Sequence, residues 1–291
     1  MIFLGKAKLI KNIEVIQKYY KILLYCSQIA RIAKPGQFVE IKVSDNYEPL
    51  LRRPFSIHRV KGNNIEILYE VLGKGTDILS QRKIGEYLDV IGPLGNGFNL
   101  NRQTDTLPAG RQEQANRQTI LVAGGMGVAP LMFLAEKLAE VKIIVLIGAK
   151  TKNHIFCEKE FKKLGCTLKF STDDGSRGFK GTATDLLKNI LLLTNNEKRL
   201  TIYACGPRPM LEEISRISRK HHIWAQISLE EHMACGIGIC FGCAVKTRHG
   251  YKRVCKEGPV FNADEIIWLK KEKDNGTPES FCFYNHPGKE F

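Results

Sequence analysis

The sequence predicts a multi-domain protein of the α+β and α/β classes, and three observations support this. The first hundred residues contain short β-branched and aromatic segments between Gly and Pro turns, which predicts an antiparallel β-barrel. From about residue 120, apolar strand and helix segments alternate, which predicts a parallel sheet. From residue 226 the chain is rich in Cys and Gly, which predicts a small third domain. The expected domains are 1–100, 120–225 and 226–270, with a low-complexity linker at 101–119 and a polar tail at 271–291.

The first domain is expected to hold strands at 37–43, 55–60, 65–71 and 87–91. Turn residues separate these strands, among them Pro35-Gly36 and Gly92-Pro93. Strands spaced this closely favour a barrel or a sandwich over βαβ units.

The second domain is expected to alternate strand and helix. Its strands are predicted at 119–123, 143–148, 167–170 and 200–205, and its helices at 131–139, 158–164 and 184–190. The segment before it repeats Asn-Arg-Gln-Thr at 101–104 and 116–119. We interpret that segment as an insertion at the domain junction, where extra length costs little, and a functional basic loop is the alternative.

Composition narrows the cellular setting more than the function. The net charge of +14 suits a nucleic acid, an anionic membrane or phosphorylated cofactors, and a generally basic surface explains it equally well. No apolar run approaches the ~18 residues of a membrane helix. Lys6 and Lys8 interrupt the N-terminal apolar stretch, so no signal peptide is expected. We therefore expect a cytoplasmic protein, in which nine cysteines favour metal or redox chemistry over disulfides.

Four cysteines near the C-terminus have the spacing of iron–sulfur ligands. Cys235, Cys240, Cys243 and Cys255 follow the pattern C-x4-C-x2-C-x11-C, whose first three positions match plant-type [2Fe–2S] proteins. Structural zinc sites use paired short spacings instead. The loop must wrap a cluster while directing backbone N–H groups at the sulfurs, so we expect positive φ angles at its glycines, which are Gly236, Gly238 and Gly242.

Two segments of the first domain are candidates for binding a flavin nucleotide. In Arg52-Arg53-Pro54-Phe55-Ser56, a guanidinium beside a stiffened strand can hold a diphosphate, and the Ser56 hydroxyl can bond a flavin ring edge. In Gly73-Lys74-Gly75-Thr76, a turn leads into a short helix predicted at 77–81 with Thr76 as N-cap, and helix N-termini bind phosphate. The turn at 92–98 either closes the barrel or contacts a cofactor.

The second domain carries candidates for a nicotinamide dinucleotide site. Gly124, Gly125 and Gly127 lie between a strand and a helix, although they depart from G-x-G-x-x-G. Cys205-Gly206 ends the last predicted strand, and ligands sit at the carboxyl ends of parallel strands. A buried structural cysteine is the alternative for Cys205. Asp173-Asp174 either accepts hydrogen bonds from a free ribose, which favours NAD over NADP, or forms a surface turn.

The order of these motifs resembles the ferredoxin–NADP reductase superfamily and, within it, the electron transfer subunits of class B dihydroorotate dehydrogenases. The segments that carry the resemblance are RRPFS (52–56), GPLGNGF (92–98), AGGMGVAP (123–130), TDDGS (172–176) and SLEEHMACGIGIC (228–240). The match runs to about residue 261 and is interrupted by 101–119, while the tail departs from the family pattern.

The resemblance implies an FAD-binding barrel, an NAD-binding α/β domain and a [2Fe–2S] domain. It implies FAD contacts at Arg53, Pro54, Phe55, Ser56, Leu68, Tyr69, Glu70, Gly75 and Thr76, and cluster ligands at the four cysteines. It also implies a partner, an FMN-containing subunit that oxidises dihydroorotate in pyrimidine synthesis, in a heterotetramer with two copies of each chain. Electrons would pass from FMN through the cluster and FAD to NAD+. A flavin belongs between the other two groups because it exchanges both hydrides and single electrons. No general base is needed on this chain, and none is identified.

Three alternatives stay open. A sibling subunit of a NADH-dependent ferredoxin–NADP oxidoreductase, or of a sulfide- or hydrogenase-linked reductase, would use the same cofactors with another partner. Some siblings replace one cluster cysteine by Asp, so four cysteines favour the pyrimidine enzyme. An oxygenase reductase would place its fourth cysteine much farther along the chain. A non-catalytic metal-binding regulator that touches nucleic acid lacks a recognition-helix motif here. Neither a nucleic acid nor a membrane is an expected partner.

Overall fold

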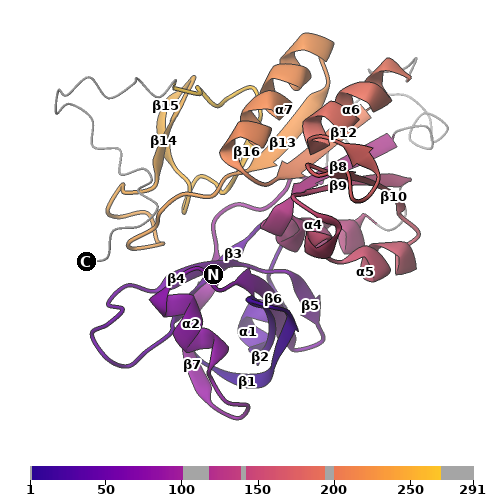
Figure 1. The fold of residues 1–291 in the computed structure, drawn as a ribbon. Coiled ribbons are helices and arrows are strands. Elements are labelled where there is room, and N and C mark those ends of the chain that lie inside the picture. The colour runs from indigo at the N-terminus through magenta and orange to yellow at the C-terminus, as the bar shows by residue number, and fades with distance from the viewer. Residues whose placement is uncertain (1, 101–117, 139–141, 194–199, 270–291) are drawn as a thin grey trace, which may run out of the picture.

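The computed structural model describes residues 2–100, 118–138, 142–193 and 200–269. Figure 1 shows a curled sheet below, a helix-covered sheet above it and a small two-stranded sheet beside the upper one. The greater parts of the linker and tail expected from the sequence, 101–117 and 270–291, lie outside the described residues.

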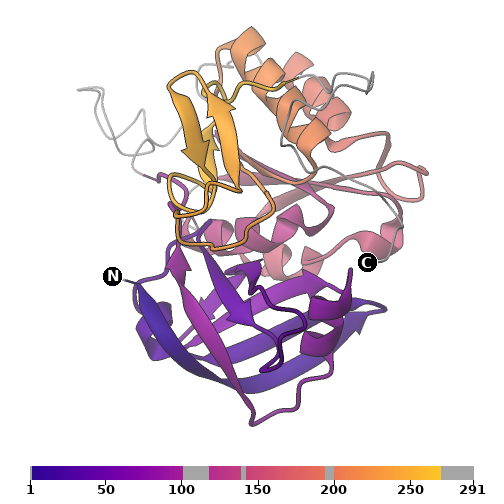
Figure 2. The same cartoon turned by 90° about the vertical axis from the view of Figure 1, so that its left-hand side faces the viewer.

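The lower sheet is antiparallel and open, with strands in the order β4-β3-β7-β1-β2-β6-β5. Figure 2 shows how it curls into a half-barrel whose two edges are β4 and β5. Its concave side buries an apolar core that includes Leu9, Ile22 and Ile67. Two short helices, α1 and α2, accompany it. The elements are β1 (Phe3–Ile16), β2 (Tyr19–Tyr25), α1 (Ser27–Ala30), β3 (Phe38–Lys42), β4 (Arg53–Ser56), β5 (Arg59–Lys61), β6 (Asn64–Glu70), α2 (Lys74–Ser80) and β7 (Tyr87–Leu94).

Strands β1 and β2 are absent from the sequence-based expectation. The pattern that encodes β1 is a strict alternation, in which buried Ala7 and Leu9 stand between lysines that point to solvent. The lysines that argued against a signal peptide are therefore the outer face of the longest strand.

The upper sheet has the order β11-β10-β9-β8-β12-β13-β16 and is parallel except for β16. Helices α6 and α7 pack on one face and α4 and α5 on the other, so both faces are buried. The elements are β8 (Gln118–Gly124), η2 (Gly125–Gly127), α4 (Val128–Lys137), β9 (Ile143–Ala149), η3 (Lys152–His154), α5 (Glu158–Lys163), β10 (Thr167–Thr172), β11 (Phe179–Lys180), α6 (Ala183–Leu192), β12 (Leu200–Cys205), α7 (Arg208–His221), β13 (Trp224–Ser228) and β16 (Val260–Asn262).

The C-terminal segment is tied to the upper sheet at both ends. It leaves β13, forms the cysteine loop and the hairpin β14 (Ala244–Thr247) and β15 (Gly250–Arg253), and returns as β16. The returning strand pairs antiparallel with β13, with Gln226 opposite Asn262 and Ser228 opposite Val260. Strand β13 therefore crosses the position where the sequence places the boundary between the second and third domains.

Polar contacts fix the lower sheet against helix α4 and its neighbours. Buried His58 lies 2.9 Å from the carbonyl oxygen of Ala129, at the start of α4. Arg59 pairs with Glu136 of the same helix, and Lys21 with Glu160 of α5 at 3.2 Å. The two sheets thus meet through a buried imidazole and two ion pairs.

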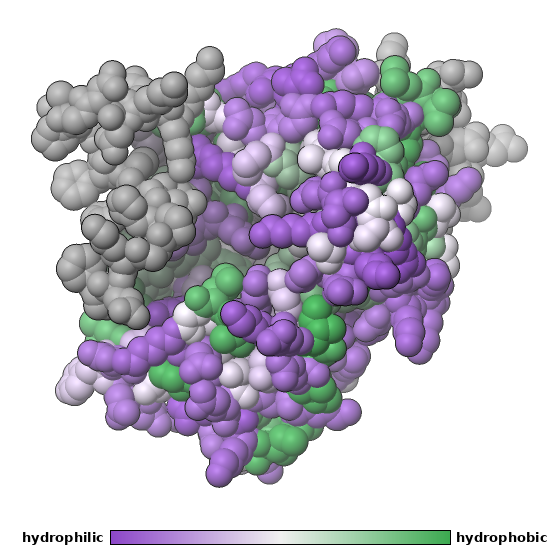
Figure 3. All heavy atoms as spheres, viewed as in Figure 1, coloured by the Kyte–Doolittle hydropathy of each residue, from purple (hydrophilic) through white to green (hydrophobic). Residues whose placement is uncertain are grey.

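The surface seen in Figure 3 is mostly hydrophilic, with apolar patches scattered over the lower sheet. In the described ranges, no helix combines the length and the apolar character that crossing a bilayer requires.

Candidate cofactor sites

The four predicted cysteine ligands come together in the C-terminal segment. Cys235 and Cys240 lie on the loop after β13, Cys243 precedes β14 and Cys255 follows β15. Backbone N–H groups point at their sulfurs: those of Ile239 and Cys240 lie 3.3 and 3.5 Å from Cys235 Sγ, and that of Cys255 lies 3.4 Å from Cys243 Sγ. Such donors stabilise thiolates, which are the form that binds iron.

The thiols differ in how easily they ionise. Burial opposes ionisation of Cys235, but the N–H groups of Cys240, Ile237 and Ile239 outweigh it and lower its pKa to about 6. Burial and the adjacent Cys243 thiol raise the pKa of Cys255 to about 12. A bound metal would have to displace that proton.

The loop reaches its shape through three positive φ angles, one of which the sequence did not indicate. Gly236 and Gly238 have φ of +64° and +83°, as expected. Gly242 does not adopt a positive φ, so that part of the expectation is wrong. Phe241 does instead, at +59°, and its ring packs under the Arg253 guanidinium, 4.6 Å away. Gly242 still directs its N–H at Cys240 Sγ, at 3.4 Å.

The donor set is the one that a two-iron cluster requires, because such a cluster is held by four cysteine thiolates and backbone N–H groups here point at the sulfurs. Cys243 and Cys255 are buried whereas Cys240 is exposed, so one side of the thiol group faces solvent. Among the described side chains, no group of three or more His, Cys, Asp or Glu has the arrangement that would hold a single metal ion.

Residues Arg53, Gly75 and Thr76 of the predicted flavin site also lie together. A Cβ on Gly75 would meet Arg53 Nε at 2.8 Å, so the arginine side chain lies over the glycine backbone. Helix α2 begins at Lys74 rather than after Thr76, and the prediction that Thr76 is its N-cap is wrong. The Thr76 hydroxyl lies in the first turn, where it accepts the N–H groups of Leu72 and Gly73 at 3.0 and 3.2 Å.

The remaining flavin candidates lie on β4 and β6 and alternate between the two faces of the sheet. Phe55 and Tyr69 point into the core of the half-barrel, 5.4 Å apart, so only their backbone can face a ligand outside it. Pro54 and Ser56 point the other way, opposite Glu40 and Phe38 of β3. On β6, Leu68 packs into the core shared with the upper sheet, and Glu70 is half-buried.

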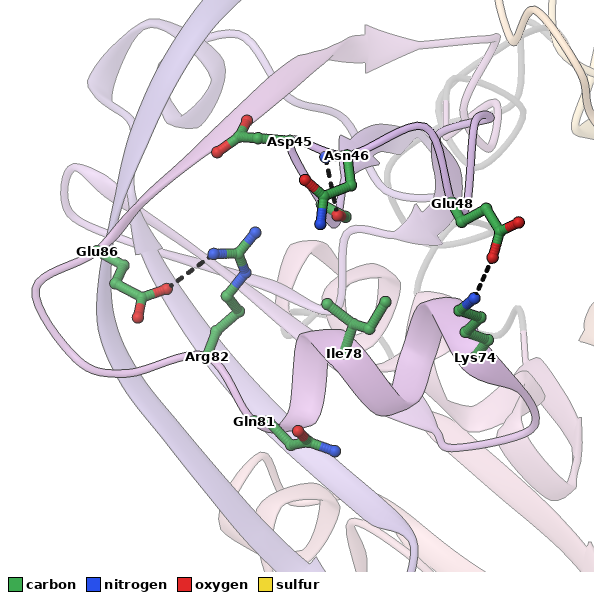
Figure 4. Close-up of a pocket in the computed structure, with 9 residues that line it drawn as sticks. Asp45, Asn46, Glu48, Lys74, Ile78, Gln81, Arg82 and Glu86 are labelled. Atoms are coloured by element: carbon green, nitrogen blue, oxygen red, sulfur yellow. Dashed lines mark hydrogen bonds and ion pairs between the residues drawn. The ribbon is translucent and has the colours of Figure 1, made fainter.

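A polar cavity of about 700 Å³ lies along α2, between this helix and the loop at 44–48. Figure 4 shows Lys74 paired with Glu48 at one end and Arg82 with Glu86 at the other. The cavity begins next to Gly75, but it lies outside the groups predicted to bind cofactors.

The nicotinamide candidates meet where β8 and β12 end side by side. A Cβ on Gly124 would collide with Pro207 and Met210, and one on Gly127 with the carbonyl group of Cys205. Gly206 has φ of +157° and its own Cβ would lie 2.9 Å from Gly124 Cα. The turns after β8 and β12 are therefore in direct backbone contact. Gly125, with φ of +52°, lies at the open side of this junction.

Two carboxylates near these sites were not found from the sequence. Glu230 follows β13, and although part of it is exposed, desolvation raises its pKa. Burial raises the pKa of Cys205 well above its usual value, and the charge of Glu230 adds to this. Glu40 is wholly buried on β3, and its burial raises its pKa to about 7. The burial of Glu40 depends on distant segments and therefore leaves no local signature in the sequence.

Asp173 and Asp174 follow β10 at the carboxyl edge of the upper sheet, as predicted. Asp174 accepts hydrogen bonds from the backbone and side chain of Ser176, at 2.9 and 2.6 Å, in an exposed turn.

Fold and site together define a reductase with an NAD-binding domain and an iron–sulfur segment. Residues 121–216 match the oxidoreductase NAD-binding domain, and residues 230–267 match the iron–sulfur cluster binding domain of dihydroorotate dehydrogenase B. The NAD and iron–sulfur parts of the cofactor prediction are confirmed by these matches.

Two relatives of known name show to which family of reductases the chain belongs. The chain is 40% identical over 270 residues to the "Dihydroorotate dehydrogenase B (NAD(+)), electron transfer subunit" of Desulforamulus reducens, covering 90% of this chain and 97% of that one. It is 40% identical over 260 residues to the protein of the same name from Geobacillus thermodenitrificans, covering 87% and 94%. The chain belongs to this family of electron transfer subunits, which confirms the predicted family, function and class of enzyme.

Solved structures agree on the fold. A NADH-dependent reduced ferredoxin–NADP oxidoreductase, described for flavin-based electron bifurcation, superposes with a TM-score of 0.77 at 27% identity over 90% of both chains. A ferredoxin NADP+ reductase from Neisseria gonorrhoeae with bound FAD and NADP superposes at 0.62 and 13% identity, covering 75% of this chain and 91% of that one. At that identity it shows the fold alone, which is that of ferredoxin reductases.

Proposed function

We propose that this chain transfers electrons from the FMN of a separate, dihydroorotate-oxidising subunit to NAD+, by way of a [2Fe–2S] cluster and FAD. The curled sheet of residues 1–100 would be the FAD domain, 120–225 the NAD domain and 226–270 the cluster domain. A reducing cytoplasm is the compartment we propose, since free thiols must hold the cluster. No nucleic acid or membrane partner is part of the proposal.

The observation that carries the proposal is the contact between the cysteine loop and the flavin-motif strands. Gly236, next to Cys235, packs against Glu40 of β3, and Glu40 lies opposite Pro54 of β4. The backbone N–H of Asn96 bonds the carbonyl oxygen of Gly258, at 2.5 Å, just after Cys255. The cysteine loop therefore packs against β3, the strand that pairs with the flavin-motif strand β4, which suits electron transfer between the two groups.

The four cysteines would hold the cluster as thiolates. Cys235 has the low pKa and three N–H donors expected of a metal-binding thiol. Buried Cys243 and Cys255 would anchor the inner side, and exposed Cys240 would place the outer side at the surface. All four fall within the matched iron–sulfur segment.

FAD would supply the conversion between hydride and single-electron chemistry. The Arg53 guanidinium over Gly75 would bind its diphosphate, with Thr76 holding the turn in shape. Pro54 and Ser56 face outward from β4, where Ser56 can bond a ring edge, while Leu68, Tyr69 and Glu70 would contact the cofactor along β6. The similarity to a flavin-based reductase at 27% identity over 90% of the chain supports this assignment.

NAD+ would bind where β8 and β12 end. Gly125 lies at the open side of the turn, where the dinucleotide could approach the backbone. Gly124, Gly127 and Gly206 let the turns after β8 and β12 pack in direct backbone contact and so shape the site. Cys205 would border the nicotinamide as an uncharged thiol, since burial raises its pKa.

The catalytic partner would dock over the exposed side of the cysteine loop. Ile237, Ile239 and Phe241 are 41%, 72% and 56% exposed there, around the exposed Cys240. Large apolar side chains gathered at a redox site are typical of a protein interface. We propose a heterotetramer of two copies of each subunit.

Co-purification with the FMN subunit encoded in the same genome tests the proposal. We expect a stable complex that reduces NAD+ with dihydroorotate and shows a [2Fe–2S] signal when reduced. A complex that instead couples NADH to ferredoxin and NADP+, without dihydroorotate activity, would assign the chain to the sibling enzymes. A colourless chain that contains zinc would overturn the redox function altogether.

A further inference from the structure

A buried carboxylate without a hydrogen-bond partner separates the cysteine loop from the flavin-motif strand. Glu40 lies in the middle of β3 and none of its side chain reaches solvent. Neither carboxylate oxygen accepts a hydrogen bond from any described residue. An unpaired buried carboxylate is costly to the fold, so stability does not explain this residue.

The side chain of Glu40 is directed at the cysteine loop. Its neighbours Val39 and Ile41 belong to the core of the half-barrel, so by strand alternation Glu40 points outward. A Cβ on Gly236 would lie 2.5 Å from Glu40 Cγ and 2.8 Å from Cδ. The carboxylate therefore rests directly against the turn that follows Cys235.

Two arginines act on Glu40 only from a distance, because each is engaged elsewhere. Arg52 donates to the carboxylate of Asp89 at 2.8 Å and to its carbonyl oxygen at 3.0 Å. Arg53 donates to the carbonyl oxygen of Leu51 at 2.7 Å and lies over Gly75. Neither guanidinium forms an ion pair with Glu40, so its charge stays directed at the cysteine loop.

We propose that Glu40 sets the reduction potential of the cluster, lowering it by placing an unpaired carboxylate against the Cys235–Gly236 turn. The inference rests on the proposed function. An added electron makes the cluster more negative, and the ionised form of a carboxylate in a low-dielectric region opposes that change. A cluster with a lower potential gives up its electron more readily, which suits delivery towards NAD+.

The test removes the negative charge of Glu40 while keeping a side chain of similar size and shape. Glu40→Gln and Glu40→Met are purified as full chains with FAD and cluster, and both potentials are measured at about pH 8 by redox titration. Paramagnetic resonance follows the cluster and visible absorbance follows the flavin. We expect both variants to favour the reduced cluster at least about tenfold more than the wild type, a shift of about +59 mV for one electron. Asp264→Asn removes an exposed carboxylate from the same segment and is expected to leave the potential unchanged.

Other outcomes would overturn the inference. Variants that keep the cluster with the wild-type potential would show that Glu40 does not influence it. A change in the flavin potential alone would show that Glu40 acts on FAD and not on the cluster. An equal change of the cluster potential in Asp264→Asn would show that the effect does not depend on the burial of the carboxylate. Loss of the cluster from both variants would show that the side chain holds the loop together instead. A wild-type chain that lacks a cluster would refute the proposed function itself.

Discussion

Replacing Gly127 by Ala is a direct test of how the nicotinamide site is built. The added Cβ would lie 2.7 Å from the backbone nitrogen of Gly206 and closer still to the carbonyl group of Cys205, whereas real Cβ contacts essentially never fall below 3.0 Å. The turn and the end of β12 must therefore separate by about 1 Å. Strand β12 cannot yield easily, because β8 and β13 hold it on both sides, with Cys205 opposite Ala123 and Ser228.

The expected loss of stability in Gly127→Ala follows from the fixed position of β12. Overpacking a tightly packed region costs about 1–3 kcal/mol, and a clash between two backbone segments belongs at the upper end, about 3 kcal/mol. Gly125→Ala is the matched control. Its backbone has φ of +52°, which costs an L-residue about 1 kcal/mol, but its Cβ would meet no described atom within 4 Å. Gly127 itself has φ of −58°, which any residue adopts. We therefore expect the larger loss of stability at the glycine with the ordinary backbone.

Thermal unfolding of both variants and titration with NADH measure the two consequences. We expect Gly127→Ala to unfold at a lower temperature than Gly125→Ala and to bind NADH at least about tenfold more weakly than the wild type does, a difference of about 1.4 kcal/mol. The iron and sulfide content should not change, because the nearest atoms that the new Cβ would meet belong to Cys205 and Gly206 and not to the cysteine loop. If Gly127→Ala proved as stable as Gly125→Ala, the backbone contact between the two turns would not be what requires glycine here.

Three further predictions test other parts of the molecule. Cys243→Ala removes a buried thiolate and should abolish the [2Fe–2S] spectrum while FAD remains bound; a retained cluster would exclude Cys243 as a ligand. Burial, then the nearby Lys21 charge, lowers the pKa of His58 from 6.5 to about 4, although its hydrogen bond to Ala129 opposes this. As the pH falls, the imidazole of His58 therefore gains a proton in the unfolded chain before it does so in the folded chain. The free energy of unfolding of the wild type should fall by about 2 kcal/mol between pH 7 and pH 5. Chemical denaturation of His58→Gln should not show this decrease. Ile239→Glu should weaken the complex with the catalytic subunit in gel filtration without changing NADH-to-dye activity, whereas Leu193→Glu, at an exposed apolar residue that directly follows α6, should leave both the complex and the activity unchanged.

The parts of the site that were predictable from sequence are those encoded locally. The cysteine ligands lie within one short segment, and the spacing of Cys235, Cys240 and Cys243 is itself the signature of the cluster. The glycine turn after β8 was likewise visible, because a strand, three glycines and a helix follow one another directly. Both are patterns in which neighbouring residues cooperate.

What the sequence did not reveal depends on segments that meet only in the folded chain. Glu40 looks like an ordinary polar residue in an alternating strand, and only its contact with Gly236 shows that it is buried against the cysteine loop. The start of α2 was placed wrongly because Gly75 has weak helix propensity, which the hydrogen bonds from the N–H groups of Leu72 and Gly73 to the Thr76 hydroxyl offset. The positive φ of Phe241 was missed because an aromatic residue rarely adopts it, and here Arg253 packs on its ring.

The same long-range contacts explain how the cysteine segment is held against both sheets, and hence how the proposed redox groups would keep a constant separation. The cysteine segment is not an appendage, because β16 closes it onto β13 and the Asn96 side chain and backbone bond Glu257 and Gly258 from the first domain's side. A segment held by both sheets cannot swing away from either without breaking a strand pair or these hydrogen bonds. Electron transfer slows steeply as two centres separate, so the returning strand serves the function as much as the cysteines do. The contacts that place the cysteine loop come from Glu40 and Asn96 on the side of the first domain and from β13 on the side of the second.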